Sequence, residues 1–163
     1  MNNLDVKRNL DNCEKDLNDA LAIITSLGGT TNVVPFLNKF GIIRACGTIE
    51  TSYKIIIADY INRRSKIQVK KFINNSVRDS SSNPSYSNIC KMLKKFDASW
   101  YTRFKNDASH HSDFSKIRTS IESLVDARNE FAHGGNPNVS LNDVIDYFTN
   151  CRTLIEILDN IVC

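Results

Sequence analysis

Residues 113–135 read DFSKIRTSIESLVDARNEFAHGG, and this stretch decides the fold class. Its apolar residues recur every three or four positions, which is the spacing of an amphipathic helix, at Phe114, Ile117, Ile121, Leu124 and Phe131. Gly134-Gly135 follows at once, and glycine is typical of a helix C-terminus. The pattern predicts a helix over residues 113–133, with His133 as its last residue.

Helical periodicity also fills the sequence on both sides of this stretch, while no alternation of period two is sustained anywhere. Further helices are predicted over residues 2–27 (ended by Gly28-Gly29), 35–64 (with a break near Gly41), 66–78, 87–106 (as a pair or one bent helix) and 141–162. Ser140 and Asp143 resemble a capping box at the start of the last helix. We therefore expect an all-α bundle of five to seven helices.

The length and composition fit one soluble domain. The chain has 163 residues, 41% of them apolar, and a net charge of +3, so it permits a polyanionic partner without requiring one. We expect a single domain over residues 1–163, with an N-terminal helix in 1–28 and a bundle core in 35–162. No apolar run reaches the roughly 20 residues that span a bilayer, and the first residues lack the apolar core of a signal peptide. A cytoplasmic location and no membrane partner are expected.

The five cysteines are odd in number and form no CxxC pair. In a reducing compartment they are expected to be buried small residues or free thiols. No two of them have zinc-ligand spacing with each other or with a histidine. We therefore predict no metal site and no cofactor.

Arg128 falls within the apolar stripe of the 113–133 helix, four residues after Leu124. A charge in that position needs a partner. Glu50, at the edge of the apolar face of the 35–64 helix, is the candidate, so a Glu50–Arg128 contact is predicted. The alternative to a functional role is an ordinary ion pair between helices.

His133 belongs to the polar side of the same helix, together with Glu122, Asp126 and Asn129. Carbonyl dipoles at a helix C-terminus favour a protonated imidazole, which suits proton transfer near neutral pH. The alternative is a surface histidine that caps the helix. Five residues place Arg128 and His133 about 140° apart on an ideal helix. Either the arginine curls around the helix, or two subunits bring both residue types together at a two-fold axis.

Here the sequence resembles a known family. Arg128-Asn129-Glu130-Phe131-Ala132-His133 resembles the R-N-x-x-x-H signature of HEPN ribonuclease domains, most closely the RiboL-PSP-HEPN branch. Three further segments resemble elements of that branch in the same order, over roughly residues 35–162: Cys46–Glu50 in the central helix, Asn83-Pro84 in a loop, and Ser140–Val144 at the start of the last helix.

The resemblance implies a HEPN-like helical bundle that forms a symmetric dimer and cuts RNA without metal, often in toxin–antitoxin or anti-phage systems. Arg128 and His133 would be catalytic, supported by Asn129 and Glu50. The RNA 2′-OH would attack the phosphorus, giving a 2′,3′-cyclic phosphate and a 5′-OH. An antitoxin protein is a possible partner. One alternative is a non-catalytic HEPN module that serves as a scaffold or as the partner of a nucleotidyltransferase antitoxin. The other is an unrelated helical interaction domain.

Two basic stretches are candidates for contacting the RNA backbone. Arg63 and Arg64 close the 35–64 helix, and Lys94 and Lys95 lie in a basic part of the 87–106 segment. The alternative for Arg63 and Arg64 is that their charges complement the dipole of the helix that they end. The alternative for Lys94 and Lys95 is a helix face exposed to solvent.

Overall fold

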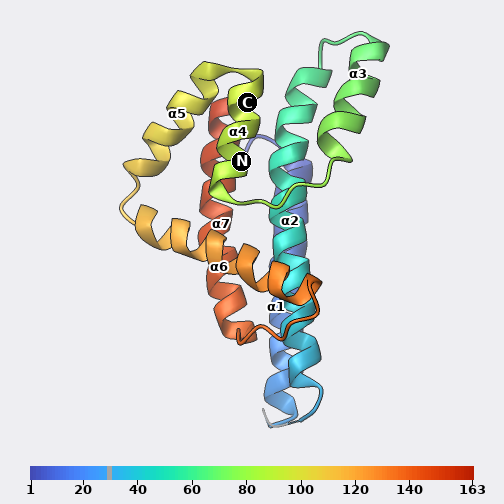
Figure 1. The fold of residues 1–163 in the computed structure, drawn as a ribbon, viewed down its shortest axis with the longest axis vertical. Coiled ribbons are helices and arrows are strands. Elements are labelled where there is room, and N and C mark those ends of the chain that lie inside the picture. The colour runs from blue at the N-terminus through green and yellow to red at the C-terminus, as the bar shows by residue number, and fades with distance from the viewer. Residues whose placement is uncertain (29–30) are drawn as a thin grey trace.

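The computed structural model describes residues 1–28 and 31–163, and these residues contain helices and no strand (Figure 1). A π-helical segment, Asn74–Arg78, continues the third helix. The helices are α1 (Leu4–Ser26), α2 (Val34–Asn62), α3 (Ile67–Ile73), α4 (Tyr86–Phe96), α5 (Ala98–Ser109), α6 (Phe114–Ala132) and α7 (Leu141–Val162). The prediction of an all-α fold with up to seven helices is confirmed for the described residues.

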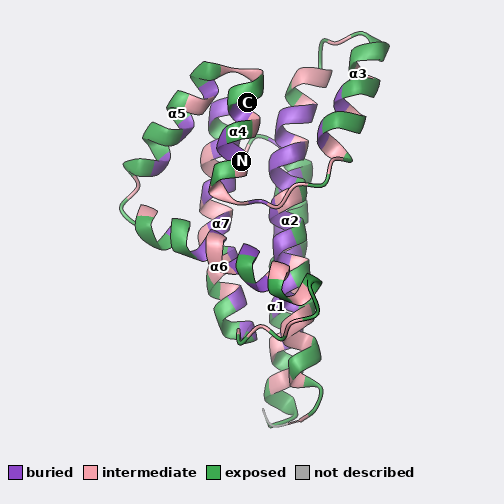
Figure 2. Ribbon diagram, viewed as in Figure 1, coloured by how far each residue is buried: buried purple, intermediate pink, exposed green. Residues whose placement is uncertain are grey.

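The core lies between the long helices α1, α2 and α7, and α6 crosses α2 and α7 at one side (Figure 1). The buried residues of α2 lie between Gly41 and Ala58, where its ribbon is mostly purple in Figure 2. Its fully buried side chains include Ile42, Ile49, Tyr53, Ile56 and Ile57. The wide apolar face of this segment therefore marks the central helix of the bundle.

The two ends of the chain lie close together (Figure 1). The carboxylate of Asp159, on α7, is fully buried and accepts hydrogen bonds from the backbone N–H groups of Asn2 and Asn3. Asn3 then caps α1, its side chain accepting from the N–H of Val6 at 3.1 Å. These bonds fix the start of α1 against the end of α7.

The glycines of α1 and α2 have different roles. α2 runs through Gly41 without a break, so that prediction is wrong. A Cβ at Gly41 would meet the side chain of Leu141 on α7, so this glycine allows close packing of two helices. Gly28 follows the end of α1 with a φ of +76°, as predicted, whereas Gly29 lies outside the described residues.

The 87–106 segment forms two separate helices, α4 and α5, the first of the two alternatives. Asp97 lies between them in an extended conformation, and its side chain caps α5 by accepting from the N–H of Ser99 at 2.6 Å. Among the helices of the described residues, none carries an apolar stretch long enough to cross a membrane.

Candidate functional site

The C-terminal end of α6 has a well-defined geometry. α6 ends at Ala132, so His133 is the residue directly after the helix and not, as was predicted, its last residue. Gly134 has a φ of +84°. Its N–H donates to Phe131 O at 3.0 Å, and the N–H of Gly135 donates to Glu130 O at 2.8 Å. This paired arrangement is a Schellman motif, and it leaves the His133 side chain exposed to solvent.

α6 buries a face that only partly matches the predicted stripe. Ile117, Ile121 and Leu124 are buried, but Phe131 is only half-buried and lies under the ammonium of Lys39, whose Nζ is 5.4 Å from the ring centroid. Arg128 is also half-buried. The prediction that these two residues lie within the core is wrong, because α6 crosses α2 and ends there (Figure 1).

Arg128 and Asn129 contact each other, since Nη1 of Arg128 donates to Oδ1 of Asn129 at 3.2 Å. Within the described residues, Arg128 forms no ion pair with Glu50, so the predicted contact is wrong. Arg128 and Glu50 nevertheless both lie near Cys46 on α2. Burial raises the pKa of the Cys46 thiol to about 12, the positive charge of Arg128 opposes this rise, and Glu50 adds to it. Within the described residues Arg128 donates one side-chain hydrogen bond, to Asn129, so most of its five N–H donors are open to a ligand.

Glu50 has a different partner, the buried side chain of Lys54 one turn further along α2. Glu50 also accepts from the N–H of Ser82 at 3.2 Å, and Lys54 donates to Ser80 O. The pair therefore holds the loop before α4 against the middle of α2. Lys54 was not predicted from the sequence, although its i,i+4 spacing from Glu50 was a readable signal.

The same loop leads to the Asn83-Pro84 segment and to α4. Asn83 Oδ1 accepts from Nδ2 of Asn88 at 2.6 Å, and Pro84 is buried. Beside this loop lies a groove of about 370 Å³ whose lining includes Ser82, Lys94 and Lys95. Two of the predicted RNA-contacting residues are thus placed next to the loop that Glu50 holds.

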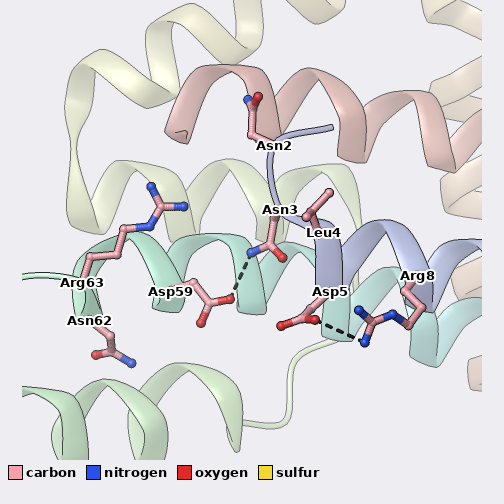
Figure 3. Close-up of a pocket in the computed structure, with 8 residues that line it drawn as sticks. All are labelled: Asn2, Asn3, Leu4, Asp5, Arg8, Asp59, Asn62 and Arg63. Carbon is pink, nitrogen blue, oxygen red and sulfur yellow. Dashed lines mark hydrogen bonds and ion pairs between the residues drawn. The ribbon is translucent and has the colours of Figure 1, made fainter.

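The other two predicted RNA contacts, Arg63 and Arg64, lie at the far end of α2. Seventeen residues of helix separate Arg63 from Cys46, or about 25 Å. Arg63 lines an open groove of about 610 Å³. Asp5, Arg8 and Asp59 line the same groove (Figure 3). Asn3 Nδ2 donates to Asp59 at 3.0 Å. The structure does not bring this groove, which contains both acidic and basic side chains, together with the end of α6.

Arg128 and His133 likewise do not contact each other directly within the described part of the chain. Arg128 lies at the edge of the α6–α2 contact, and His133 extends from the free end of the helix. The end of α6 thus offers a guanidinium with free donors, an amide and an exposed imidazole.

Comparison with models of protein families gives a match over residues 4–163, to the RiboL-PSP-HEPN family. The chain therefore belongs to this family of HEPN domains. The match includes α1, which lies outside the segments that carried the resemblance in the sequence. Searches of curated proteins and of solved structures found no match.

Proposed function

We propose that this protein is a metal-independent endoribonuclease in which two subunits each contribute the end of α6 to one site. HEPN domains are generally associated with ribonuclease activity. The observation that carries the proposal is the exposed His133 at the end of α6, one turn beyond an Arg128 whose side chain contacts Asn129. A purely structural helix end has no need for this set of groups.

The proposed reaction uses a nucleophile that RNA itself supplies. His133 of one subunit accepts the proton of the 2′-OH, and the 2′-oxygen forms a bond to phosphorus. The bond between phosphorus and the 5′-oxygen breaks, and His133 of the partner subunit donates a proton to that leaving oxygen. The products are a 2′,3′-cyclic phosphate and a 5′-OH.

The remaining groups stabilise the transition state or position other parts of the site. Arg128 forms charge-assisted hydrogen bonds to the phosphate and offsets the extra negative charge of the transition state. Asn129 holds the guanidinium through the 3.2 Å hydrogen bond. Glu50 is a positioning residue, because it fixes the loop before α4, and Lys94 and Lys95 would contact phosphates further along the strand. Such an activity fits a toxin or an anti-phage effector in the cytoplasm, restrained by an antitoxin protein.

The test is cleavage of bulk RNA in excess EDTA by the wild-type protein and by His133→Ala and Arg128→Ala. We expect chelator-resistant cleavage that falls by at least about 100-fold in each variant, which is the usual contribution of a general base. Matched controls are His110→Ala and Arg118→Ala, which remove an exposed histidine and an exposed α6 arginine away from the motif. If a folded, dimeric protein cuts none of the RNA, the proposal is wrong and a non-catalytic HEPN scaffold takes its place.

A further inference from the structure

One face of α2 is covered along only half of its length. Near the C-terminal end of the helix, Ala58 packs against Ile73 and Val77 from α3 and the π-helical segment. Going back along the same face, at helical spacing, the residues are Thr51, Gly47, Ile43, Phe40 and Phe36. All five are exposed. The N-terminal half of this face therefore has no partner within the described part of the chain.

The bare half lacks the charged residues that normally cover a solvent-facing helix. Every exposed residue of α2 from Val34 to Thr51 is uncharged. Phe36 is 70% exposed, Phe40 45% and Ile43 44%. In contrast, the exposed residues of the neighbouring α1 include Asp5, Lys7, Arg8, Glu14, Lys15 and Asp19. Large apolar side chains gathered on one helix face are typical of an interaction surface.

Gly47 lies in the middle of this face without a reason inside the protomer. Glycine within a helix is less favourable than alanine, and a Cβ at Gly47 would meet no atom within 4 Å. Instead, Gly47 opens a groove of about 390 Å³, lined also by Asn9, Ile43, Arg44, Thr48 and Thr51. The groove has the room that an aromatic side chain needs.

The large and small residues of the face are arranged symmetrically. Phe40 and Gly47 are equally far from the point midway between residues 43 and 44, and so are Phe36 and Thr51. If a second α2 lay antiparallel on the first with this point on the two-fold axis, each Phe40 would oppose Gly47 and each Phe36 would oppose Thr51. Ile43 would meet its own copy near the axis. Such matching is the condition for an isologous interface.

We infer that a second copy of this chain covers the bare face of α2, with the two α2 helices antiparallel and Phe40 of each copy in the Gly47 groove of the other. The large residues of one copy thus fill the space above the small residues of the other. The contact runs from Phe36 to Thr51, about 22 Å of helix at 1.5 Å per residue.

This arrangement also places the two ends of α6, a step that rests on the proposed function. α6 lies on the flank of α2 that carries Lys39 and Cys46, about 100° around the helix from Phe40 and Gly47. A two-fold axis perpendicular to antiparallel helices keeps the same flank of both copies on the same side. Both α6 ends, each with Arg128 and His133, therefore share one side of the dimer. Parallel pairing would place them on opposite sides.

Sedimentation equilibrium of Gly47→Leu, Phe40→Ala and the double variant tests the interface. We expect each single substitution to raise the dimer Kd at least tenfold, because one fills the groove and the other removes its occupant. The double variant should recover much of the lost dimer affinity, since it exchanges the large and the small side chain between positions 40 and 47. Gly47→Leu should not lower the Tm of the monomer, because leucine is the better helix former. Leu4→Ala, at a residue that is 68% exposed on α1, is the control.

A cross-link gives the register independently. In a Cys163→Ser background, which removes the exposed native cysteine, Ile43→Cys should form a disulfide-linked dimer on mild oxidation, and Leu4→Cys should not. A protein that is monomeric at all concentrations, or a dimer that ignores Gly47→Leu and forms no cross-link with Ile43→Cys, overturns the interface. If a dimer that ignores Gly47→Leu still cleaves RNA in excess EDTA, the proposed function survives without this interface, whereas a protein that is monomeric at all concentrations overturns the two-subunit site as well. If the dimer behaves as expected but cuts no RNA, the interface stands and the proposed function fails.

Discussion

At the scale of single residues, the Glu50–Lys54 pair is the most unusual feature of α2. The Lys54 side chain is 4% exposed and that of Glu50 19%. Taking both charges out of water is costly, and their attraction and extra hydrogen bonds must offset that cost. Ser80 O and the Ser82 N–H supply these bonds. The pair thus ties the position of the loop to a largely buried ion pair on α2.

Lys54→Met is expected to lower the free energy of unfolding by about 3 kcal/mol, because it leaves the Glu50 carboxylate without its cation in a largely buried place. Glu50→Gln combined with Lys54→Met should recover part of this loss. Urea unfolding measures both. Lys15→Met is the control, since Lys15 is 73% exposed in its pair with Asp19 and such solvent-exposed pairs contribute little to stability. Equal losses at Lys54 and Lys15 would show that burial of the pair has no energetic importance.

At the scale of elements, the end of α6 sets where the candidate catalytic groups lie. The positive φ of Gly134 turns the chain away directly after His133. A Cβ at Gly135 would lie 2.9 Å from Glu130 O, so the second glycine permits the close approach of its N–H to that carbonyl. The two glycines therefore serve one turn for two different physical reasons.

Gly134→Ala should lower the free energy of unfolding by roughly 1 kcal/mol, because alanine disfavours the left-handed conformation. Gly134→Asn should lose less than half as much, since asparagine tolerates that conformation. Thermal or urea unfolding of the two variants gives the comparison. An alanine variant as stable as the asparagine variant would contradict this role for the positive φ.

At the scale of the whole molecule, the core encloses thiols between its helices. Burial raises the pKa of the Cys46 thiol to about 12 from an ordinary value of 9.0. Burial also raises the pKa of the Cys151 thiol, and Cys46 and Glu122 add to that rise. In the folded protein these thiols keep their protons at a pH where the unfolded chain releases them.

The free energy of unfolding should consequently fall as the pH rises from about 9 toward 12, by roughly 1 kcal/mol per pH unit for each thiol. The sign follows because the unfolded state binds fewer protons than the folded state in this range. Urea unfolding at about pH 8 and pH 10 measures the slope. Cys46→Ala should make it shallower, while Cys163→Ser should change it less. A slope that is the same in the wild type and Cys46→Ala would contradict this account of the buried thiol.

Most of the fold could be predicted from the sequence, because hydrophobic periodicity is a local signal. It placed every long helix to within a few residues, and the capping box at Ser140 and Asp143 is present. Gly41 was misread because a glycine that allows close helix packing looks the same in sequence as one that ends a helix. The Glu50–Arg128 contact was wrong because periodicity gives the face of a residue but not where one helix ends on another.

The claim that His133 and Arg128 catalyse attack by the RNA 2′-OH has one most direct measurement. An oligoribonucleotide cut by the protein in EDTA is compared with the same strand carrying a single 2′-deoxy sugar on the 5′ side of the cut, and the product ends are determined by mass spectrometry. We predict 2′,3′-cyclic phosphate and 5′-OH ends on the unmodified strand and no cleavage at the modified linkage. Cleavage at the 2′-deoxy position, or products with 5′-phosphate ends, would contradict the account.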